Sequence, residues 1–127
     1  MTLQPASGAR DLNPQQVRKN HLIASKLSSL YQLWGYERIS PPHIERLDTL
    51  MAAGGISNNE ILKIVSDEPL GLRPEITASI VRAASTRFYK YERPLRFWST
   101  GTSFKCNQSI DGGIDIEESF QSGVELI

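Results

Sequence analysis

The chain has 127 residues, which is enough for one compact domain but not for two. Hydrophobic residues make up 39% and charged residues 22%, a composition that argues against a disordered chain. Because 14 basic side chains balance 14 acidic ones, the formal net charge is zero, and bulk electrostatics gives no reason to expect a nucleic-acid or anionic-membrane partner.

The first predicted element is a helix over residues 14–34, which follows a polar arm. Asn13 can cap this helix, Pro14 suits the first helical position, and Gln16 stands where the partner of a capping box belongs. Gly35 follows where a left-handed C-terminal cap is expected. One apolar face is predicted from residues spaced three and four apart, namely Ile23, Leu27, Leu30 and Trp34.

A short strand and a second helix are predicted next. Residues 36–40 read as a strand that ends at Pro41 and Pro42, because proline cannot donate to a strand ladder. Residues 44–53 have a helical pattern that stops at Gly54. No apolar run approaches the roughly 20 residues of a membrane span, and the first ten residues lack the apolar core of a signal peptide.

The rest of the chain is predicted to contain a hairpin, a third helix and two long strands. The predicted bounds are 60–65 and 70–73 for the hairpin, 75–88 for the helix, 94–104 and 118–127 for the strands, and 107–115 for a flexible loop before the last strand. Strands outnumber helices and short turns join them, which favours an α+β fold with a mixed, mainly antiparallel sheet and flanking helices. The sequence ends within the last predicted strand, so we expect residues 1–127 to be the N-terminal part of a larger domain.

The last strand separates its residues into an apolar and a polar face. Alternation predicts Phe120, Val124 and Leu126 as core residues. On the other face, Gly123 leaves a gap between Gln121 and Glu125, whose amide and carboxylate could hold an ammonium group. The alternative is that this polar face is simply the solvent-exposed side of an antiparallel sheet.

The predicted junction between strand and helix near residue 75 carries a second candidate pair. Glu75 falls in the first helical turn, where the helix dipole favours an anion, and Thr77 can cap the helix. A ligand site built from a strand end and a helix start is one interpretation. A purely structural cap is the other.

Other reactive residues give no sign of a site. Cys106 is the only cysteine, so an intramolecular disulfide is impossible and a reducing cytoplasm is expected. His21 and His43 do not have metal-ligand spacing with each other or with Cys106, so we predict no metal and no cofactor. Residues 82–96 contain five basic side chains with three aromatic ones among them, which could contact a nucleic acid. Glu92 interrupts them, and a solvated surface is the simpler explanation.

Five segments, in the same order along the chain, resemble segments of the histidyl-tRNA synthetase family. They are residues 5–14, residues 34–45, residues 72–77, residues 96–104 and residues 121–125. Residues 34–45 are similar to class II motif 1, which forms a dimer interface, and residues 96–104 are similar to motif 2. The resemblance implies a class II aminoacyl-tRNA synthetase-like fold. It also implies that four residues contact histidine, namely Glu75, Thr77, Gln121 and Glu125.

The chain departs from the synthetase pattern where ATP would bind. Motif 2 carries an arginine and then a glutamate, and Lys105 and Asn107 stand at those positions here. Lysine keeps the charge but not the planar, two-pronged donor geometry of arginine. Ile76 replaces a glycine of the histidine-binding segment. These departures predict a degenerate ATP site.

The combined pattern is similar to the family of ATP phosphoribosyltransferase regulatory subunits, which are synthetase paralogues without aminoacylation activity. This resemblance implies a non-catalytic homodimer that assembles with a short-form catalytic subunit, supports the first step of histidine biosynthesis and takes part in feedback inhibition by histidine. Two alternatives stay open. One is a fragment of a histidyl-tRNA synthetase, and the other is a free-standing paralogue that binds an amino acid.

Overall fold

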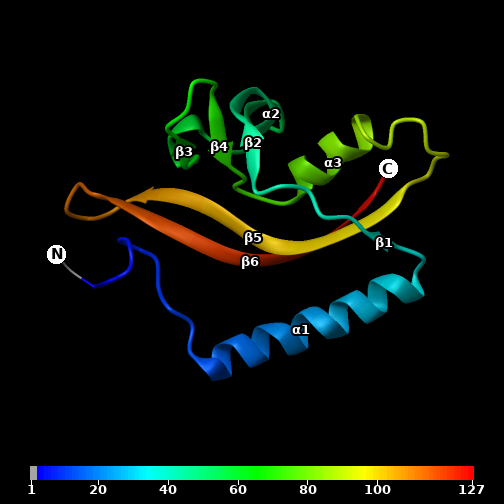
Figure 1. Cartoon of the computed structure of the whole chain (residues 1–127), viewed down its shortest axis with the longest axis horizontal. Coiled ribbons are helices and arrows are strands. Elements are labelled where there is room, and N and C mark those ends of the chain that lie inside the picture. The colour runs from blue at the N-terminus through cyan, green and yellow to red at the C-terminus, as the bar shows by residue number, and fades with distance from the viewer. Residues whose placement is uncertain (1–2) are drawn as a thin grey trace.

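A long two-stranded ribbon forms the middle layer of the computed structural model, which describes residues 3–127. The strands are β5 (Arg96–Gln108) and β6 (Ile114–Leu126), and they pair antiparallel along their whole length. The short β1 (Glu37–Arg38) pairs with β5 in parallel. Helix α1 (Pro14–Leu33) lies on one side of the ribbon and the smaller elements lie on the other (Figure 1).

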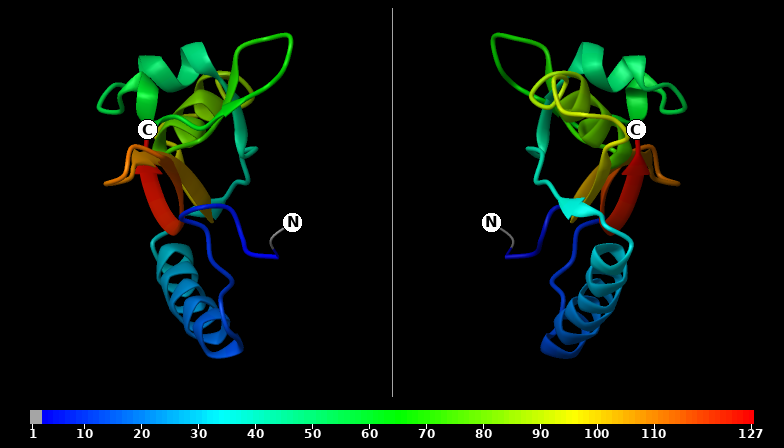
Figure 2. Two further views of the ribbon diagram at one scale, coloured as in Figure 1. Left: turned by 90° about the vertical axis from the view of Figure 1, so that its left-hand side faces the viewer. Right: turned by 90° about the vertical axis from the view of Figure 1, so that its right-hand side faces the viewer.

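The opposite side of the ribbon carries a second sheet and the remaining helices. The sheet has the strand order β2-β4-β3 and is antiparallel throughout. Views along the length of the molecule show this upper layer, the ribbon and α1 as three successive levels (Figure 2). The elements are β2 (Ile44–Arg46), α2 (Leu47–Ala52), η1 (Asn58–Glu60), β3 (Lys63–Ile64), β4 (Leu70–Leu72) and α3 (Thr77–Ser85). The predicted α+β class with a mainly antiparallel, mixed sheet is confirmed.

The sequence signals at both ends of α1 act as predicted. The Asn13 side chain accepts from the Gln16 backbone at 2.8 Å, and the Gln16 side chain accepts from the Asn13 backbone at 2.9 Å. Gly35 has φ +80° and follows the C-cap residue Trp34. None of the residues of α1 is fully buried, because the helix touches the ribbon along one side only.

Two predicted helices are shorter than expected. Residues 44–53 do not form one helix, because Ile44 pairs with Leu72 in the ladder between β2 and β4 and the helix begins only at Leu47. Strand pairing with a distant segment thus overrides the local helical pattern. The predicted helix over 75–88 begins at Thr77 and ends at Ser85. None of the helices in residues 3–127 combines the length and the apolar character that a membrane span requires.

The ribbon is longer than predicted, and its loop is shorter. Strand β5 continues to Gln108, four residues beyond the predicted end, and the turn occupies only residues 109–113. The Asn107 side-chain amide donates to Glu117 across the strands at 2.8 Å. The backbone N–H of Ser109 donates to Gly113 at 2.9 Å, which closes the turn. The prediction of a flexible loop over 107–115 was wrong because these cross-strand contacts extend the ladder.

The N-terminal arm lies against the outer edge of β6. The Ile116 N–H donates to the Ser7 carbonyl at 2.7 Å, and the Ser7 hydroxyl donates to the Asp115 carboxylate. Gly8 has φ +88°, and a Cβ at this position would meet the Ile116 carbonyl oxygen at 2.2 Å. Only glycine therefore lets the arm approach the strand this closely.

The core lies between α3 and the ribbon. Its buried members are Ile76, Ile80, Ala84, Leu95 and Phe97. The predicted core residues of β6 are wrong, since Phe120, Val124 and Leu126 are 51%, 38% and 58% exposed. These side chains lie on the α1 side of the ribbon, where Trp98 supplies the buried surface and packs on Tyr31 with ring centroids 5.5 Å apart.

Candidate functional site

The polar face of β6 turns toward the layer that contains α3. Gln121 is opposite Gly101, and Glu125 is opposite the core residue Phe97. Gln121 and Glu125 are both half-buried. A Cβ built on Gly123, which lies between them, would meet no atom within 4 Å. An amide and a carboxylate thus flank an open space on the covered side of the ribbon, so this face is not simply a solvent-facing one.

Glu75 acts as the N-terminal cap of α3. Its carboxylate accepts from the Thr77 N–H at 3.1 Å and from the Ala78 N–H at 3.0 Å. Ile76 occupies the N-cap position without a side-chain hydrogen bond, and Thr77 is exposed. The predicted capping by the Thr77 side chain is wrong, because the preceding carboxylate already accepts from the first N–H groups of the helix.

A cavity of about 430 Å³ lies beside Glu75 and Thr77. The other lining residues come from α2, the residue after it and α3, and among residues 3–127 none that lines it belongs to β6. The four predicted histidine contacts therefore form two groups on the same side of the ribbon. Glu75 and Thr77 border this cavity, whereas Gln121 and Glu125 border the gap at Gly123.

Arg73 joins the two layers and was not singled out by the sequence. Only 2% of its surface is exposed. Its Nε donates to the Thr102 carbonyl at 2.9 Å, and its Nη1 donates to the Pro41 carbonyl at 3.2 Å. Its backbone N–H and carbonyl pair with His43 and Phe104. One side chain thus ties the strand before α3 to β5 and to the segment before β2.

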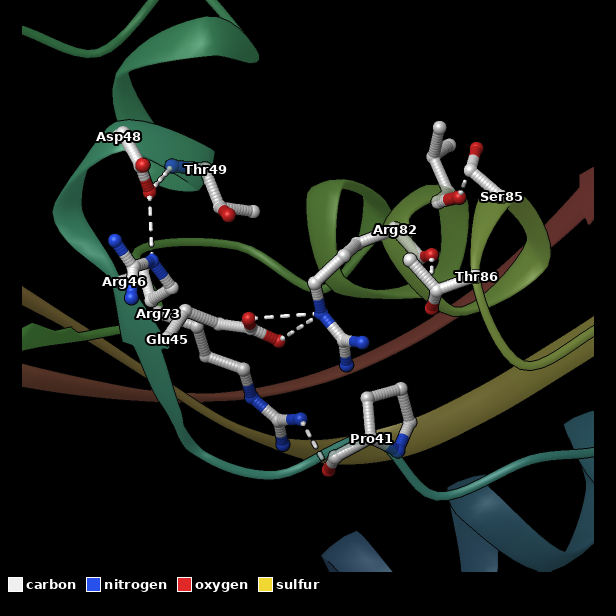
Figure 3. A network of polar contacts seen from close by, with 10 residues as sticks. Pro41, Glu45, Arg46, Asp48, Thr49, Arg73, Arg82, Ser85 and Thr86 are labelled. Atoms are coloured by element: carbon white, nitrogen blue, oxygen red, sulfur yellow. Dashed lines mark hydrogen bonds and ion pairs between the residues drawn. The ribbon is translucent and has the colours of Figure 1, made fainter.

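A buried carboxylate compensates the positive charge in this region. Glu45 is only 5% exposed, and its carboxylate binds Arg82 Nε with an N–O distance of 2.8 Å (Figure 3). Burial lowers the pKa of Arg73, and the negative charge of Glu45 opposes that shift. Reasoning from the sequence missed Glu45 and Arg82 because both resemble ordinary surface charges. Strand alternation would have predicted the reverse, because Ile44 is 47% exposed and Glu45 is buried.

Lys105 and Asn107 lie on the same face of β5, near the free end of the ribbon. Lys105 is directly opposite Glu117, and the Asn107 amide donates to the same carboxylate at 2.8 Å. A carboxylate therefore lies next to both residues that the sequence comparison assigns to the degenerate ATP site. Its negative charge would oppose the binding of a phosphate at this point.

The sequence model of the histidyl-tRNA synthetase family matches residues 8–127. The chain belongs to this family. It is also 97% identical over all 127 residues to a protein of Prochlorococcus marinus (strain NATL1A) named ATP phosphoribosyltransferase regulatory subunit. A protein of Synechococcus sp. (strain WH7803) with the same name is 60% identical over 126 residues. The chain spans 32% of the length of each of these relatives.

Solved structures share the fold. One, an ATP phosphoribosyltransferase regulatory subunit/histidyl-tRNA synthetase from Bacillus halodurans C, matches 99% of this chain and 32% of its own with a TM-score of 0.86 and 26% identity. The apo Staphylococcus aureus histidyl-tRNA synthetase matches 97% of this chain and 28% of its own with a TM-score of 0.72 and 21% identity. The class II synthetase-like fold expected from the five segments is confirmed.

Proposed function

We propose that the chain is part of a non-catalytic regulatory subunit of ATP phosphoribosyltransferase, which supports the first step of histidine biosynthesis. The observation that carries this proposal is the 97% identity over the whole chain to relatives with that name. Residues 1–127 would then be the N-terminal part of a class II synthetase-like domain, which agrees with the 32% of each relative that they span. The single cysteine favours a cytoplasmic protein.

The ribbon supports the absence of aminoacylation activity. Amino-acid activation needs a donor that clamps the α-phosphate of ATP, and arginine does this with two parallel hydrogen bonds. Lys105 supplies one point charge instead, and Glu117 is its direct partner in the strand ladder. Asn107 is already engaged with Glu117. The three residues together favour a site that no longer holds ATP in a reactive position.

The second candidate is a fragment of a histidyl-tRNA synthetase. It is favoured by the family match and by the fold shared with a solved enzyme of that name. Histidine-dependent exchange of pyrophosphate into ATP separates the two candidates. We expect the full-length natural protein to show no exchange above background. Clear exchange would overturn the regulatory proposal.

Histidine is the proposed regulatory ligand, with Gln121 and Glu125 as its main contacts. Their amide and carboxylate can accept hydrogen bonds from an α-ammonium group, and Gly123 leaves room for the ligand between them. The carboxylate of Glu75 accepts two backbone N–H groups, yet it retains lone pairs for a third donor. Thr77 is exposed at the same helix start and completes the proposed set.

Two protein partners belong to the proposal. The first is a second copy of the chain, which would pack against the motif 1 region. Large apolar side chains support this interface because α1 and its C-terminal end expose them, namely Leu22, Ile23, Leu30, Leu33 and Trp34. The second partner is the short-form catalytic subunit of ATP phosphoribosyltransferase.

Co-purification of the full-length natural protein with a short-form ATP phosphoribosyltransferase tests the proposal directly. We expect the two proteins to elute together and the catalytic activity to rise in the complex. A catalytic subunit that elutes alone and keeps the same activity would contradict the regulatory function. Histidine added to the complex then tests feedback inhibition separately.

A further inference from the structure

The guanidinium group of Arg73 carries a buried positive charge without an ion pair. Its side chain is only 2% exposed, and none of the ion pairs among residues 3–127 includes it. The carboxylate of Glu45 binds Arg82 Nε at 2.8 Å and acts on Arg73 from beyond ion-pair distance. A charge removed from water normally has a direct counter-ion, so this arrangement leaves a place for an anion beside Arg73.

Structural hydrogen bonds account for only part of this side chain. A guanidinium group has five N–H donors. In Arg73, Nε donates to the Thr102 carbonyl at 2.9 Å and Nη1 donates to the Pro41 carbonyl at 3.2 Å, and neither acceptor carries a net charge (Figure 3). The remaining nitrogen, Nη2, lies at Gly101, where any other residue would have its Cβ. The joining of the two layers explains Nε and Nη1, but it does not explain the position of Nη2.

Gly101 places Nη2 on the floor of the proposed histidine site. Gly101 is directly opposite Gln121 in the ladder, so the two positions share the face that is turned toward α3. Gly123 is the diagonal neighbour of Gly101 on this face, and such neighbours lie about 7–8 Å apart. A ligand above Gly123, where a Cβ would meet no atom within 4 Å, therefore comes within reach of Nη2.

The four proposed histidine contacts include no positive charge. They are two carboxylates, one amide and one hydroxyl, namely Glu75, Glu125, Gln121 and Thr77. These groups suit an ammonium ion, but a free amino acid also has a carboxylate, which the two glutamates would repel. The cation that β5 places on this face is Lys105, four residues and roughly 13 Å along the strand from Gly101.

We propose that Arg73 Nη2 binds the α-carboxylate of the amino acid and thereby makes the site select free α-amino acids over the corresponding amines. The ammonium group then binds Glu125 and Gln121, and the carboxylate neutralises the buried guanidinium through a charge-assisted hydrogen bond. Two carbonyl groups already hold the guanidinium in place, so little further ordering is needed when the ligand binds. The inference rests on the proposed histidine site and names the residue that binds the carboxylate there.

The first test compares two ligands on the full-length natural protein by titration calorimetry. Histamine has the same imidazole and ammonium groups as histidine but no carboxylate. We expect histidine to bind at least about tenfold more tightly, because the carboxylate adds a charged hydrogen bond. Equal affinities for histidine and histamine would overturn the inference without the need for any variant.

The second test removes Nη2 and measures both ligands again. Arg73→Lys keeps the positive charge, but one ammonium group cannot reach both the carbonyl acceptors and position 101. Histidine affinity should fall by about tenfold, whereas histamine affinity should change by less than about threefold. A purely structural function of Arg73 would instead weaken both ligands by the same factor. Far-ultraviolet circular dichroism checks that the variant is folded.

Gly101→Ala gives the same information by a different route. Its methyl group displaces the guanidinium group of Arg73 without changing any charge, so it should also reduce the preference for histidine over histamine. Arg46→Lys is the matched control. Arg46 is exposed and pairs with Asp48 and Glu68 on the surface, so both affinities should stay within about twofold of the natural values.

The outcomes separate this inference from the function on which it rests. If histidine fails to bind the natural protein at millimolar concentration, the histidine site itself is wrong and the inference falls with it. If histidine binds but Arg73→Lys and Gly101→Ala weaken both ligands equally, the site stands and Arg73 has only a structural function. If Lys105→Gln alone removes the preference for histidine, the carboxylate binds near the free end of the ribbon, which also overturns the inference.

Discussion

The guanidinium group of Arg73 lies where a side chain on Gly101 would have to be. A Cβ at Gly101 would be 2.3 Å from Arg73 Nη2, well inside van der Waals contact. Arg73 cannot move away freely, because its other nitrogens donate to carbonyl groups of Thr102 and Pro41. Glycine is thus required at position 101, because any side chain there would displace the buried guanidinium group of Arg73.

Gly101→Ala should lower the free energy of unfolding by about 1–3 kcal/mol, since the added methyl group forces Arg73 out of its hydrogen bonds. Gly123→Ala is the matched control, because the same added atom in the partner strand meets nothing within 4 Å. Its effect should stay within about 0.5 kcal/mol. Urea denaturation of the full-length protein measures both. Equal stability of the two variants would show that Arg73 can relocate without cost.

Glu45→Gln should destabilise the fold by about 3 kcal/mol, because it leaves Arg73 and Arg82 without their buried counter-charge. The partial exposure of the Arg82 side chain, 29%, makes this an upper figure. Glu68→Gln, which removes an exposed partner of Arg46, should change stability by less than about 0.5 kcal/mol. Thermal denaturation compares them, and an equally mild effect of Glu45→Gln would argue against a structural function for the pair.

Replacing Glu75 should have two effects, whereas replacing Glu125 should have one. Glu75→Ala removes the cap of α3 and should cost about 1 kcal/mol of stability in addition to any loss of histidine affinity. Glu125→Ala should weaken histidine binding by about 1–3 kcal/mol, the value of a charged hydrogen bond, with little change in unfolding. Calorimetric titration with histidine and urea denaturation separate the two effects. Unchanged affinity in both variants would place histidine elsewhere.

The pKa of Asp111 should respond to Ser109. The Ser109 hydroxyl donates to the Asp111 carboxylate at 2.7 Å and, as the largest cause, lowers the pKa of that carboxyl. A folded pKa below the unfolded one means that the contact stabilises the fold above the unfolded pKa and loses this effect as pH falls through the folded pKa. Ser109→Ala should raise the pKa of Asp111 in a carbon-13 titration. An unchanged titration would mean that the turn backbone sets it.

Local signals in the sequence predicted the elements whose causes are themselves local. The capping box of Asn13 and Gln16, the glycine at position 35 and the alternation around Gly123 are all patterns within a few residues, and the structure confirms them. Alternation along a strand is enough to place Gln121 and Glu125 on the face opposite Phe120, Val124 and Leu126, which are the exposed residues of β6. The strand period therefore predicted that Gln121 and Glu125 share a face, but not that this face is the covered one.

Features that depend on distant partners could not be predicted in the same way. Residues 44–53 look helical until Ile44 pairs with Leu72. The side of β6 that is covered depends on where α3 packs, so Phe120 was wrongly assigned to the core. Nothing in the sequence around Arg73 indicates that the carbonyl groups of Pro41 and Thr102 accept its hydrogen bonds.

The contacts of Arg73 also constrain how the chain can fold while it is being made. Ribosomes add roughly 5–20 residues per second, and domains begin to fold as their N-terminal parts emerge. Pro41 and Arg73 leave the ribosome well before Thr102, whose carbonyl accepts from Arg73 Nε. Until then Nη1 can already find the Pro41 carbonyl, but Nε lacks its acceptor and hydrogen-bonds to water. The hydrogen bonds of Arg73 are therefore completed only when β5 packs against the layer that contains α3.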